Sequence, residues 1–213
     1  ISIFNRYGVL LVFDEVMCGA GRTGSFFAWE QECAKPDILT LAKGLSGGHL
    51  PLSAVCTTEE VHQAIAGGSG KLSATQTYMG HPLACAAGLG AMEIVRGTDL
   101  IDQVAGKGEL LMQKLHDRFY DHPHIDYIRG RGLFVGLELV QDKVNRQPFP
   151  AEQFMFRKVR QKAFDQGLIC WPGCGSADNG GDFILLAPPY IIADAEMDEL
   201  VNKLATTIDL CTG

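Results

Sequence analysis

Apolar residues in the first half of the chain are concentrated in short segments. Residues 8–13 form a continuous apolar run that ends at Asp14 and Glu15, and a run of this length is typical of a buried strand in a parallel sheet. Two further short strand candidates lie at residues 36–41 and 52–57. Between and after them, the sequence predicts helices over residues 58–66 and 81–96. Strands that alternate with helices predict an α/β unit with a mostly parallel sheet.

The pattern changes near residue 97, where a Gly-Thr-Asp sequence interrupts the helical spacing. The elements expected after it are a long amphipathic helix, a strand pair joined at glycines 130 and 132, a helix, two strands and a closing helix, at residues 100–120, 126–140, 151–166, 168–171, 183–187 and 194–210. Strands and helices without strict alternation predict a small α+β domain. We therefore expect two domains, over residues 1–97 and 98–213.

Composition and charge exclude several classes of protein. Hydrophobic residues make up 46% of the 213 residues and charged residues 20%, so a packed core is expected and intrinsic disorder is not. The formal net charge of −7 argues against a nucleic-acid partner, because binding to phosphates requires clustered Lys and Arg. Since no apolar run approaches the ~18 residues of a membrane span, we expect no membrane association.

The cysteines indicate a reducing environment. Seven are scattered along the chain, and only Cys170 and Cys174 lie close together in sequence. No histidine stands at zinc-ligand spacing around this pair, so no metal site is expected. Scattered cysteines without a secretory hydrophobic segment are typical of cytoplasmic proteins, and we expect a cytoplasmic location.

Three features of the first half carry candidate chemistry. Asp14 and Glu15 follow the first apolar run, and α/β sheets bind ligands outside the carboxyl ends of their strands. A carboxylate there can hold a heteroaromatic ring nitrogen in its protonated form. Lys43 lies between an apolar run and a glycine-rich loop, a setting in which desolvation can make a lysine a Schiff-base nucleophile. Residues 75–82 bring hydroxyl groups to a helix start, which suits a phosphate.

Each of these features also has a purely structural interpretation. An aspartate at the end of a strand is commonly a turn or capping residue, and Thr-x-Thr before a helix commonly caps that helix. A lysine that precedes glycine is commonly a solvated loop residue. The three features favour a cofactor site only when they are considered together.

The sequences of these segments also resemble those of a known protein family. LLVFDEVMCGAGRTG, LAKGLSGGHLPLSAV and QTYMGHPLACAAG follow one another at residues 10–24, 41–55 and 76–88. Together with RGRGLFVGLELV and LLAPPYII at residues 129–140 and 185–192, they resemble the class III (ω- or ornithine-type) aminotransferases. These are pyridoxal-phosphate enzymes of fold type I. The resemblance implies that residues 1–97 are the C-terminal part of the large, cofactor-binding domain and that residues 98–213 are the small C-terminal domain.

The resemblance also implies roles for individual residues. Asp14 would pair with the pyridine nitrogen of pyridoxal 5'-phosphate, and Val16 would pack on one face of the ring. Lys43 would form the Schiff base with the cofactor and then transfer a proton between substrate and cofactor. Thr77 would reach the cofactor phosphate of a neighbouring subunit, which implies a homodimer with shared active sites. The substrates would be an amine or amino acid as donor and a keto acid or aldehyde as acceptor.

Other positions of the motifs are expected to support the site or to select its substrates. The glycine-rich turn at residues 19–24, including its arginine, is expected to be structural, and Glu15 a support residue near the cofactor. Many relatives place an arginine in the small domain to bind the substrate carboxylate, but residues 173–182 contain none. Arg129 and Arg131 are alternatives, although a turn between strands is an equally good structural location for them.

The length and the first residue of the chain bear on its interpretation as a whole. Members of the family are considerably longer, and the chain begins with Ile1 rather than Met. We therefore expect one piece of a longer aminotransferase, and we expect it to self-associate in isolation because its sheet would be open. The alternatives are a truncated, non-catalytic remnant that acts as a structural or binding partner, and a related pyridoxal-phosphate decarboxylase, racemase or aminomutase.

Overall fold

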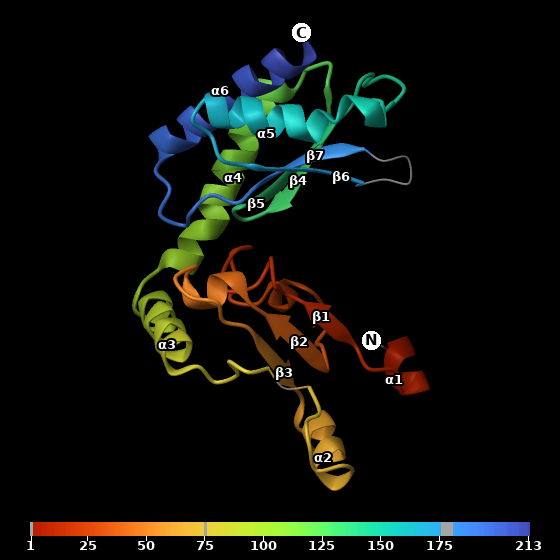
Figure 1. The fold of residues 1–213 in the computed structure, drawn as a ribbon, viewed down its shortest axis with the longest axis vertical. Coiled ribbons are helices and arrows are strands. Elements are labelled where there is room, and N and C mark those ends of the chain that lie inside the picture. Colours follow the sequence, from red (N-terminus) through yellow and green to blue (C-terminus); the bar gives the residue numbers. More distant parts are fainter. Residues whose placement is uncertain (1, 75, 176–180) are drawn as a thin grey trace. The chain divides into compact units, whose positions relative to one another are not determined.

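The structure, a computed structural model, describes residues 2–74, 76–175 and 181–213 (Figure 1). The chain divides into two compact units, unit 1 (Ile1–Asp102) and unit 2 (Gln103–Gly213). The division falls in the first turn of a long helix, shortly after the boundary that the hydrophobic pattern predicts at residues 97 and 98.

Unit 1 contains a three-stranded sheet with helices and loops around it. Its elements are α1 (Ser2–Tyr7), β1 (Val12–Asp14), the 3-10 helix η1 (Ala28–Gln31), β2 (Ile38–Leu41), the 3-10 helix η2 (Lys43–Ser46), β3 (Ala54–Thr57), α2 (Glu59–Gly67) and α3 (Pro82–Gly97). The strand order is β1-β2-β3, with β1 parallel to β2 and β2 antiparallel to β3. The predicted α/β class is confirmed, and the sheet described here is mixed.

The first strand is shorter and more exposed than its apolar run predicts. β1 begins at Val12, which is 55% exposed, and the preceding Leu10 is exposed to the same extent. Among the described strands β1 pairs only with β2, so its other edge is open. The expectation of a buried strand at residues 8–13 is therefore wrong, because an apolar run is buried only where neighbouring elements cover it.

Helix α3 packs its small residues against the loop that follows β2. Ala84 and Gly88 form the buried side of α3. A Cβ added at Gly88 would lie 2.5 Å from Cδ2 of Leu52, so only glycine fits without movement of that side chain. The contacts between α3 and η2 place this helix directly against the segment that begins at Lys43.

Unit 2 is a four-stranded antiparallel sheet packed against helices. Its elements are α4 (Leu100–Phe119), which begins in unit 1, β4 (Ile125–Arg131), β5 (Phe134–Leu139), the 3-10 helix η3 (Ala151–Gln153), α5 (Met155–Asp165), β6 (Trp171–Cys174), β7 (Asp182–Leu186) and α6 (Asp194–Thr212). The strand order is β4-β5-β7-β6, and each neighbouring pair is antiparallel. Figure 1 shows α5 and α6 side by side, in agreement with the contacts between them.

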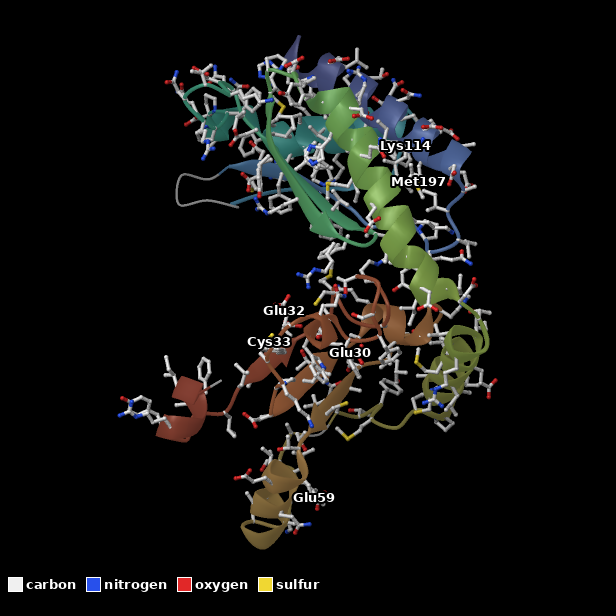
Figure 2. The ribbon with its side chains drawn as sticks, turned by 180° about the vertical axis from the view of Figure 1, so that it is seen from behind. Glu30, Glu32, Cys33, Glu59, Lys114 and Met197 are labelled. Atoms are coloured by element: carbon white, nitrogen blue, oxygen red, sulfur yellow. The ribbon has the colours of Figure 1, made fainter. Side chains whose placement is uncertain are left out.

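A single hydrophobic core joins the sheet of unit 2 to its helices. Val135 and Leu137 on β5 and Met197 on α6 are completely buried within it. Alternate residues of β5 point into this core, as the period of a strand with one covered face requires. On the outside, Lys114 of α4, which is labelled in Figure 2, forms an ion pair with Asp198 of α6. Unit 2 therefore has the small α+β architecture that the sequence predicts.

Two elements of unit 2 differ from the sequence prediction. The helix expected over residues 151–166 is interrupted at Phe154, which adopts a left-handed backbone conformation with φ of 47°. The first turn of α5 is bound by a residue that is distant in sequence. Oδ1 of Asp182 accepts a hydrogen bond of 3.1 Å from the backbone N–H of Phe156. The strand expected at residues 168–171 begins only at Trp171, where the chain comes into register with β7.

Neither a membrane-crossing helix nor a cluster of metal-ligating side chains occurs in the part of the chain that the structure describes. Within those residues, no helix combines the length and the apolar character that crossing a bilayer requires. Nor do three or more His, Cys, Asp or Glu side chains gather there in a way that could hold a metal ion. The seven cysteines carry free thiols and are distributed over both units.

Candidate active site

The two residues with the clearest candidate chemistry lie at the same edge of the unit 1 sheet. β1 and β2 run parallel, and Asp14, the last residue of β1, stands opposite Thr40 of β2. Lys43 follows the end of β2 and opens η2. Because parallel strands bring their carboxyl ends to one edge, the carboxylate and the amine occupy the part of an α/β sheet where ligands bind.

The Asp14 carboxylate is held through one of its two oxygens. Oδ1 accepts a hydrogen bond of 3.0 Å from the backbone N–H of Val16 and one of 3.1 Å from Oγ1 of Thr40. Among the described residues no donor reaches Oδ2, and the side chain is exposed. The structure thus leaves one anionic oxygen available to a ligand. Asp14 ends a strand as predicted, but that strand is not buried.

Glu15 has a structural role that the sequence alone does not reveal. Its side chain is buried, with only 3% of the residue exposed. Its two oxygens each accept a hydrogen bond of 2.8 Å from a backbone N–H at the start of η1, one from Ala28 and the other from Trp29. These bonds satisfy the free amides of the 3-10 helix and anchor the loop after β1. They support the expectation that Glu15 is a support residue.

The glycine-rich turn after Asp14 depends on close backbone approach. Gly19 donates a backbone hydrogen bond of 2.9 Å to the carbonyl of Glu15, and a Cβ at this position would lie only 2.8 Å from the same oxygen. Gly21 and Gly24 have φ values of 97° and 93°, which favour glycine. The thiol of Cys18 contacts the carbonyl oxygen of Asp14 at 3.7 Å, and burial raises its pKa. This turn therefore shapes the loop rather than supplying a reactive group.

Lys43 occupies an unusual backbone conformation at the start of η2. Its φ of 46° lies in the left-handed region, which costs a residue with a Cβ on the order of 1–3 kcal/mol. The hydroxyl of Ser46 donates to the carbonyl of Leu50, and Gly47 ends the 3-10 helix with φ of 62°. The lysine itself is exposed. Non-glycine residues in this conformation cluster at functional sites.

Thr77 lies in the turn at residues 77–80, before α3 begins at Pro82. Its side chain is exposed, and within the described residues it forms no hydrogen bond with Asp14 or Lys43. No side chain caps the start of α3, so amides of its first turn are available to a ligand. Thr75, which belongs to the same predicted phosphate-binding segment, is outside the described residues.

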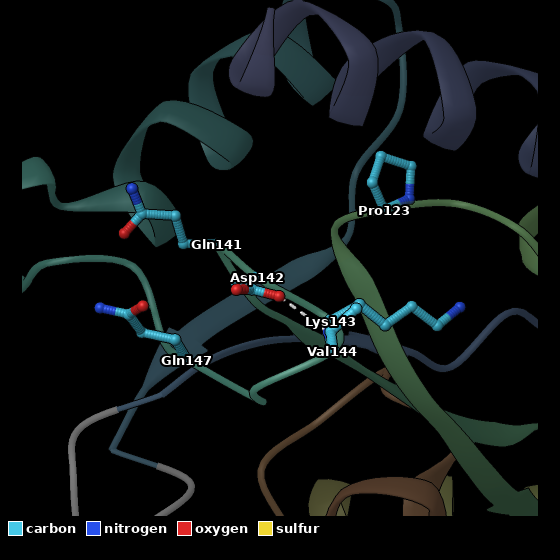
Figure 3. Close-up of a pocket in the computed structure, with 6 residues that line it drawn as sticks. All are labelled: Pro123, Gln141, Asp142, Lys143, Val144 and Gln147. Carbon is cyan, nitrogen blue, oxygen red and sulfur yellow. Dashed lines mark hydrogen bonds between the residues drawn. The ribbon is translucent and has the colours of Figure 1, made fainter.

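Two hollows lie in unit 2, and none of these residues lines them. In the one shown in Figure 3, the Asp142 carboxylate accepts hydrogen bonds from the backbone N–H groups of Val144 at 2.8 Å and Asn145 at 3.2 Å. The Asn145 side chain bonds it as well and lowers its pKa. This carboxylate is thus used within its own turn. The other hollow lies over β4, β5 and β7 and includes Arg129, which forms an ion pair with Glu138.

Thr40 is the residue of this site that sequence reasoning missed. Its hydroxyl contacts Asp14 although the two residues are 26 positions apart in sequence. The available signal was a single polar residue among the apolar residues at positions 38–41. Such a residue is informative only once the strand register is known. The second arginine expected as an alternative carboxylate ligand, Arg131, ends β4 and is exposed.

Comparison with known proteins finds aminotransferases both in a family model and among individual relatives. The family model described as Aminotransferase class-III matches residues 1–208. An uncharacterized aminotransferase of Schizosaccharomyces pombe is 41% identical over 208 residues, which are 97% of this chain and 45% of that protein. The adenosylmethionine-8-amino-7-oxononanoate aminotransferase of Aquifex aeolicus is 34% identical over 97% of this chain and 45% of its own length.

Solved structures show the same partial coverage. A thermostable (S)-enantioselective ω-transaminase from Thermomicrobium roseum matches all of this chain and 46% of its own, with 33% identity and a TM-score of 0.89. The ω-transaminase from Pseudomonas jessenii in complex with PMP matches 99% of this chain and 46% of its own, with 33% identity and a TM-score of 0.87. The chain thus spans about half the length of the relatives that it matches.

Proposed function

Because this chain belongs to the class III aminotransferase family, we propose that it carries the lysine and aspartate of a pyridoxal-phosphate-dependent transaminase. The reaction would move an amino group between an amine or amino acid and a keto acid or aldehyde. The observation that supports this function most directly is the position of Asp14 and Lys43 at the carboxyl ends of two adjacent parallel strands. The names of similar proteins include several different substrates, so the proposed donors are amines and amino acids in general.

The residues present fit the proposed cofactor. Asp14 offers a carboxylate oxygen without a donor among the described residues, and Lys43 offers an exposed amine. When bound, pyridoxal phosphate supplies an electron sink for the bonds at the substrate's amine-bearing carbon. A free anionic oxygen and an accessible amine are what such a group requires.

Each residue then has a defined task in the mechanism. Asp14 would hold a proton at the pyridine nitrogen, because an anion nearby favours the protonated form. Lys43 would hold the cofactor through Nζ and would move a proton at Nζ as acid and base. Val16 would orient the ring by packing on one face. Glu15 keeps the loop of Asp14 and Val16 in place through η1.

The assembly and location of the protein belong to the same proposal. We infer a homodimer in which Thr77 binds the cofactor phosphate in the neighbouring subunit, consistent with its exposure and its place before α3. Unit 1 would be part of the cofactor-binding domain and unit 2 the small domain. The free cysteines support a reducing, cytoplasmic location.

Reductive labelling tests this function. The protein is incubated with pyridoxal phosphate, reduced with borohydride and digested, and its peptides are mapped by mass. We expect a phosphopyridoxyl group on Lys43 that disappears in Lys43→Ala but persists in Lys71→Ala, which removes another exposed lysine of unit 1. Labelling spread over surface lysines, or none, would contradict the proposal. Product analysis with amine donors then separates transamination from decarboxylation, racemisation or amino shift on the same lysine.

A further inference from the structure

We propose that Thr40 is a positioning residue that orients the Asp14 carboxylate toward the ring nitrogen of the cofactor. This inference rests on the proposed function, because it concerns how Asp14 would perform its task. The observation that carries it is the hydrogen bond of 3.1 Å from Oγ1 of Thr40 to Oδ1 of Asp14.

The strand register makes this contact a fixed feature of the sheet. Asp14 and Thr40 are direct partners in the parallel pair of β1 and β2, so their side chains project on the same face. The backbone continues the connection, since the N–H of Glu15 donates a hydrogen bond of 3.0 Å to the carbonyl of Thr40. Thr40 is therefore bound to the Asp14 segment through both its backbone and its side chain.

The contact determines which oxygen of Asp14 is available. Oδ1 receives both the hydroxyl of Thr40 and the N–H of Val16, and these two donors restrict rotation of the carboxylate. Within the described residues Oδ2 has no donor and is left to accept from a ligand N–H. Without the hydroxyl, the N–H of Val16 alone would hold Oδ1, and the carboxylate could turn away from the position that a ring nitrogen requires.

The chemistry of the donor is suited to this task. Thr40 and the Val16 amide are neutral donors, and the described residues include no ion pair to Asp14. A lysine or arginine in their place would neutralise the carboxylate and compete with a protonated ring for it. Two neutral donors fix the orientation and leave the full negative charge for the ligand.

The test compares two cofactors in matched variants. Thr40→Val removes the hydroxyl and keeps the shape, whereas Thr40→Ser keeps the hydroxyl. Thr57→Val is the control, because Thr57 lies on the same sheet in β3, is exposed and has no side-chain hydrogen bond among the described residues. Affinity is measured for pyridoxal phosphate and for its carbocyclic analogue, in which C–H replaces the ring nitrogen. The measurement uses the longest polypeptide in which this sequence occurs naturally.

The preference for pyridoxal phosphate over the carbocyclic analogue reports the contact between Asp14 and the ring nitrogen. We expect Thr40→Val to reduce this preference by at least roughly three-fold and by no more than roughly a hundred-fold, which is about the most that complete loss of one hydrogen bond to a charged group costs. Thr40→Ser and Thr57→Val should retain it. The ¹⁵N chemical shift of a labelled ring nitrogen should show reduced protonation in Thr40→Val alone.

The outcomes separate this inference from the proposed function. If Thr40→Val binds pyridoxal phosphate with the wild-type preference and nitrogen shift, the positioning role is overturned while the proposed function stands. If the wild-type protein shows no preference between the two cofactors, the proposed contact between Asp14 and the ring nitrogen is contradicted, and the role of Thr40 is overturned with it. If Thr40→Val does not fold, Thr40→Ala is compared with Thr40→Ser, and equal preferences in that pair overturn the inference.

Discussion

The two units of this protein bury their apolar residues to very different extents. The core cluster of unit 2 combines side chains from three helices and three strands, and many of them are completely buried. In the described part of unit 1, the buried apolar side chains are those of Ala20, Leu39, Leu41 and Ala84. Unit 1 nevertheless carries the candidate catalytic residues. The extensive packed core of this chain and its candidate catalytic residues therefore lie in different units.

The exposed apolar residues of unit 1 sharpen this contrast. Large apolar side chains are exposed on the segment around β1, on β3, on the segment before α3 and on α3 itself, at Val9, Leu10, Val12, Val55, Leu72, Tyr78, Met79, Leu83, Leu89 and Ile94. Surfaces of this kind mark sites of association with other protein surfaces. They agree with the expectation of self-association, which light scattering of the isolated chain would test.

The largest effect on the free energy of unfolding is expected from a substitution in the core of unit 2, which leaves unit 1 unchanged. Leu115 on α4 is completely buried, whereas Leu89 on α3 is 66% exposed. We expect Leu115→Ala to lower the free energy of unfolding by about 2–5 kcal/mol, because it removes buried methyl groups and leaves a cavity. Leu89→Ala should change it by less than about 0.5 kcal/mol. Urea denaturation of both variants measures the difference, and a large loss at Leu89 would mean that this face of α3 is covered in solution.

A pair of glycines on one helix gives the next test. A Cβ on Gly108 would lie 2.4 Å from the backbone of Gly132, whereas a Cβ on Gly106 would meet nothing within 4 Å. We expect Gly108→Ala to destabilise unit 2 by roughly 2 kcal/mol, because α4 must move away from the turn between β4 and β5. Gly106→Ala should instead stabilise the helix by up to about 1 kcal/mol.

Thermal denaturation of the two glycine variants provides the measurement. Equal melting temperatures would show that α4 and the turn do not pack as closely as the structure describes. The corresponding contact of unit 1 involves the flexible end of Leu52 rather than backbone. Gly88→Ala should therefore be tolerated better than Gly108→Ala.

The smallest effect is a pH dependence confined to unit 2. His124 donates its backbone N–H to Nδ1 of His122 at 3.2 Å, so Nε2 of His122 carries the proton and donates to Asp209 at 3.2 Å. Burial lowers the pKa of His122, although Asp209 acts in the opposite direction and Arg118 adds to the lowering. The folded state therefore binds this proton less readily than the unfolded state. The contribution of neutral His122 to the stability of the folded state is fully present above the ordinary histidine pKa of ~6.5. It is lost as pH falls from there toward the lower pKa that His122 has in the folded state.

Urea denaturation between pH 7.5 and 5.5 measures this dependence. We expect the free energy of unfolding of the wild-type chain to fall with pH by no more than about 1.4 kcal/mol per pH unit from this one group. His122→Gln should have a smaller slope, because it cannot take up the proton. An unchanged slope would show that another group governs the pH dependence.

Much of the fold could be predicted because it depends on local patterns. The strand candidates at residues 36–41 and 52–57 contain β2 and β3, and helices α2, α3, α4 and α6 lie within a few residues of their predicted bounds. The family motifs agree with the class III match. The break at Phe154 was not predicted, and the first turn of α5 is bound by a residue that no local pattern reveals, since the Phe156 N–H donates to Asp182, 26 positions away in sequence. The exposure of β1 was likewise not predictable, because burial depends on which neighbours a strand has.

The sequence by itself determined which residues could carry chemistry, because Asp14, Lys43 and Thr77 stand in motifs whose order and spacing are a property of the chain alone. Only the tertiary structure decided how Asp14 is held. The parallel register of β1 and β2 brings Thr40 to its carboxylate, and the loop after β1 brings the start of η1 to Glu15. The physical reason is that a hydrogen bond requires two atoms to meet at about 3 Å, and for residues far apart in sequence only the fold provides that meeting.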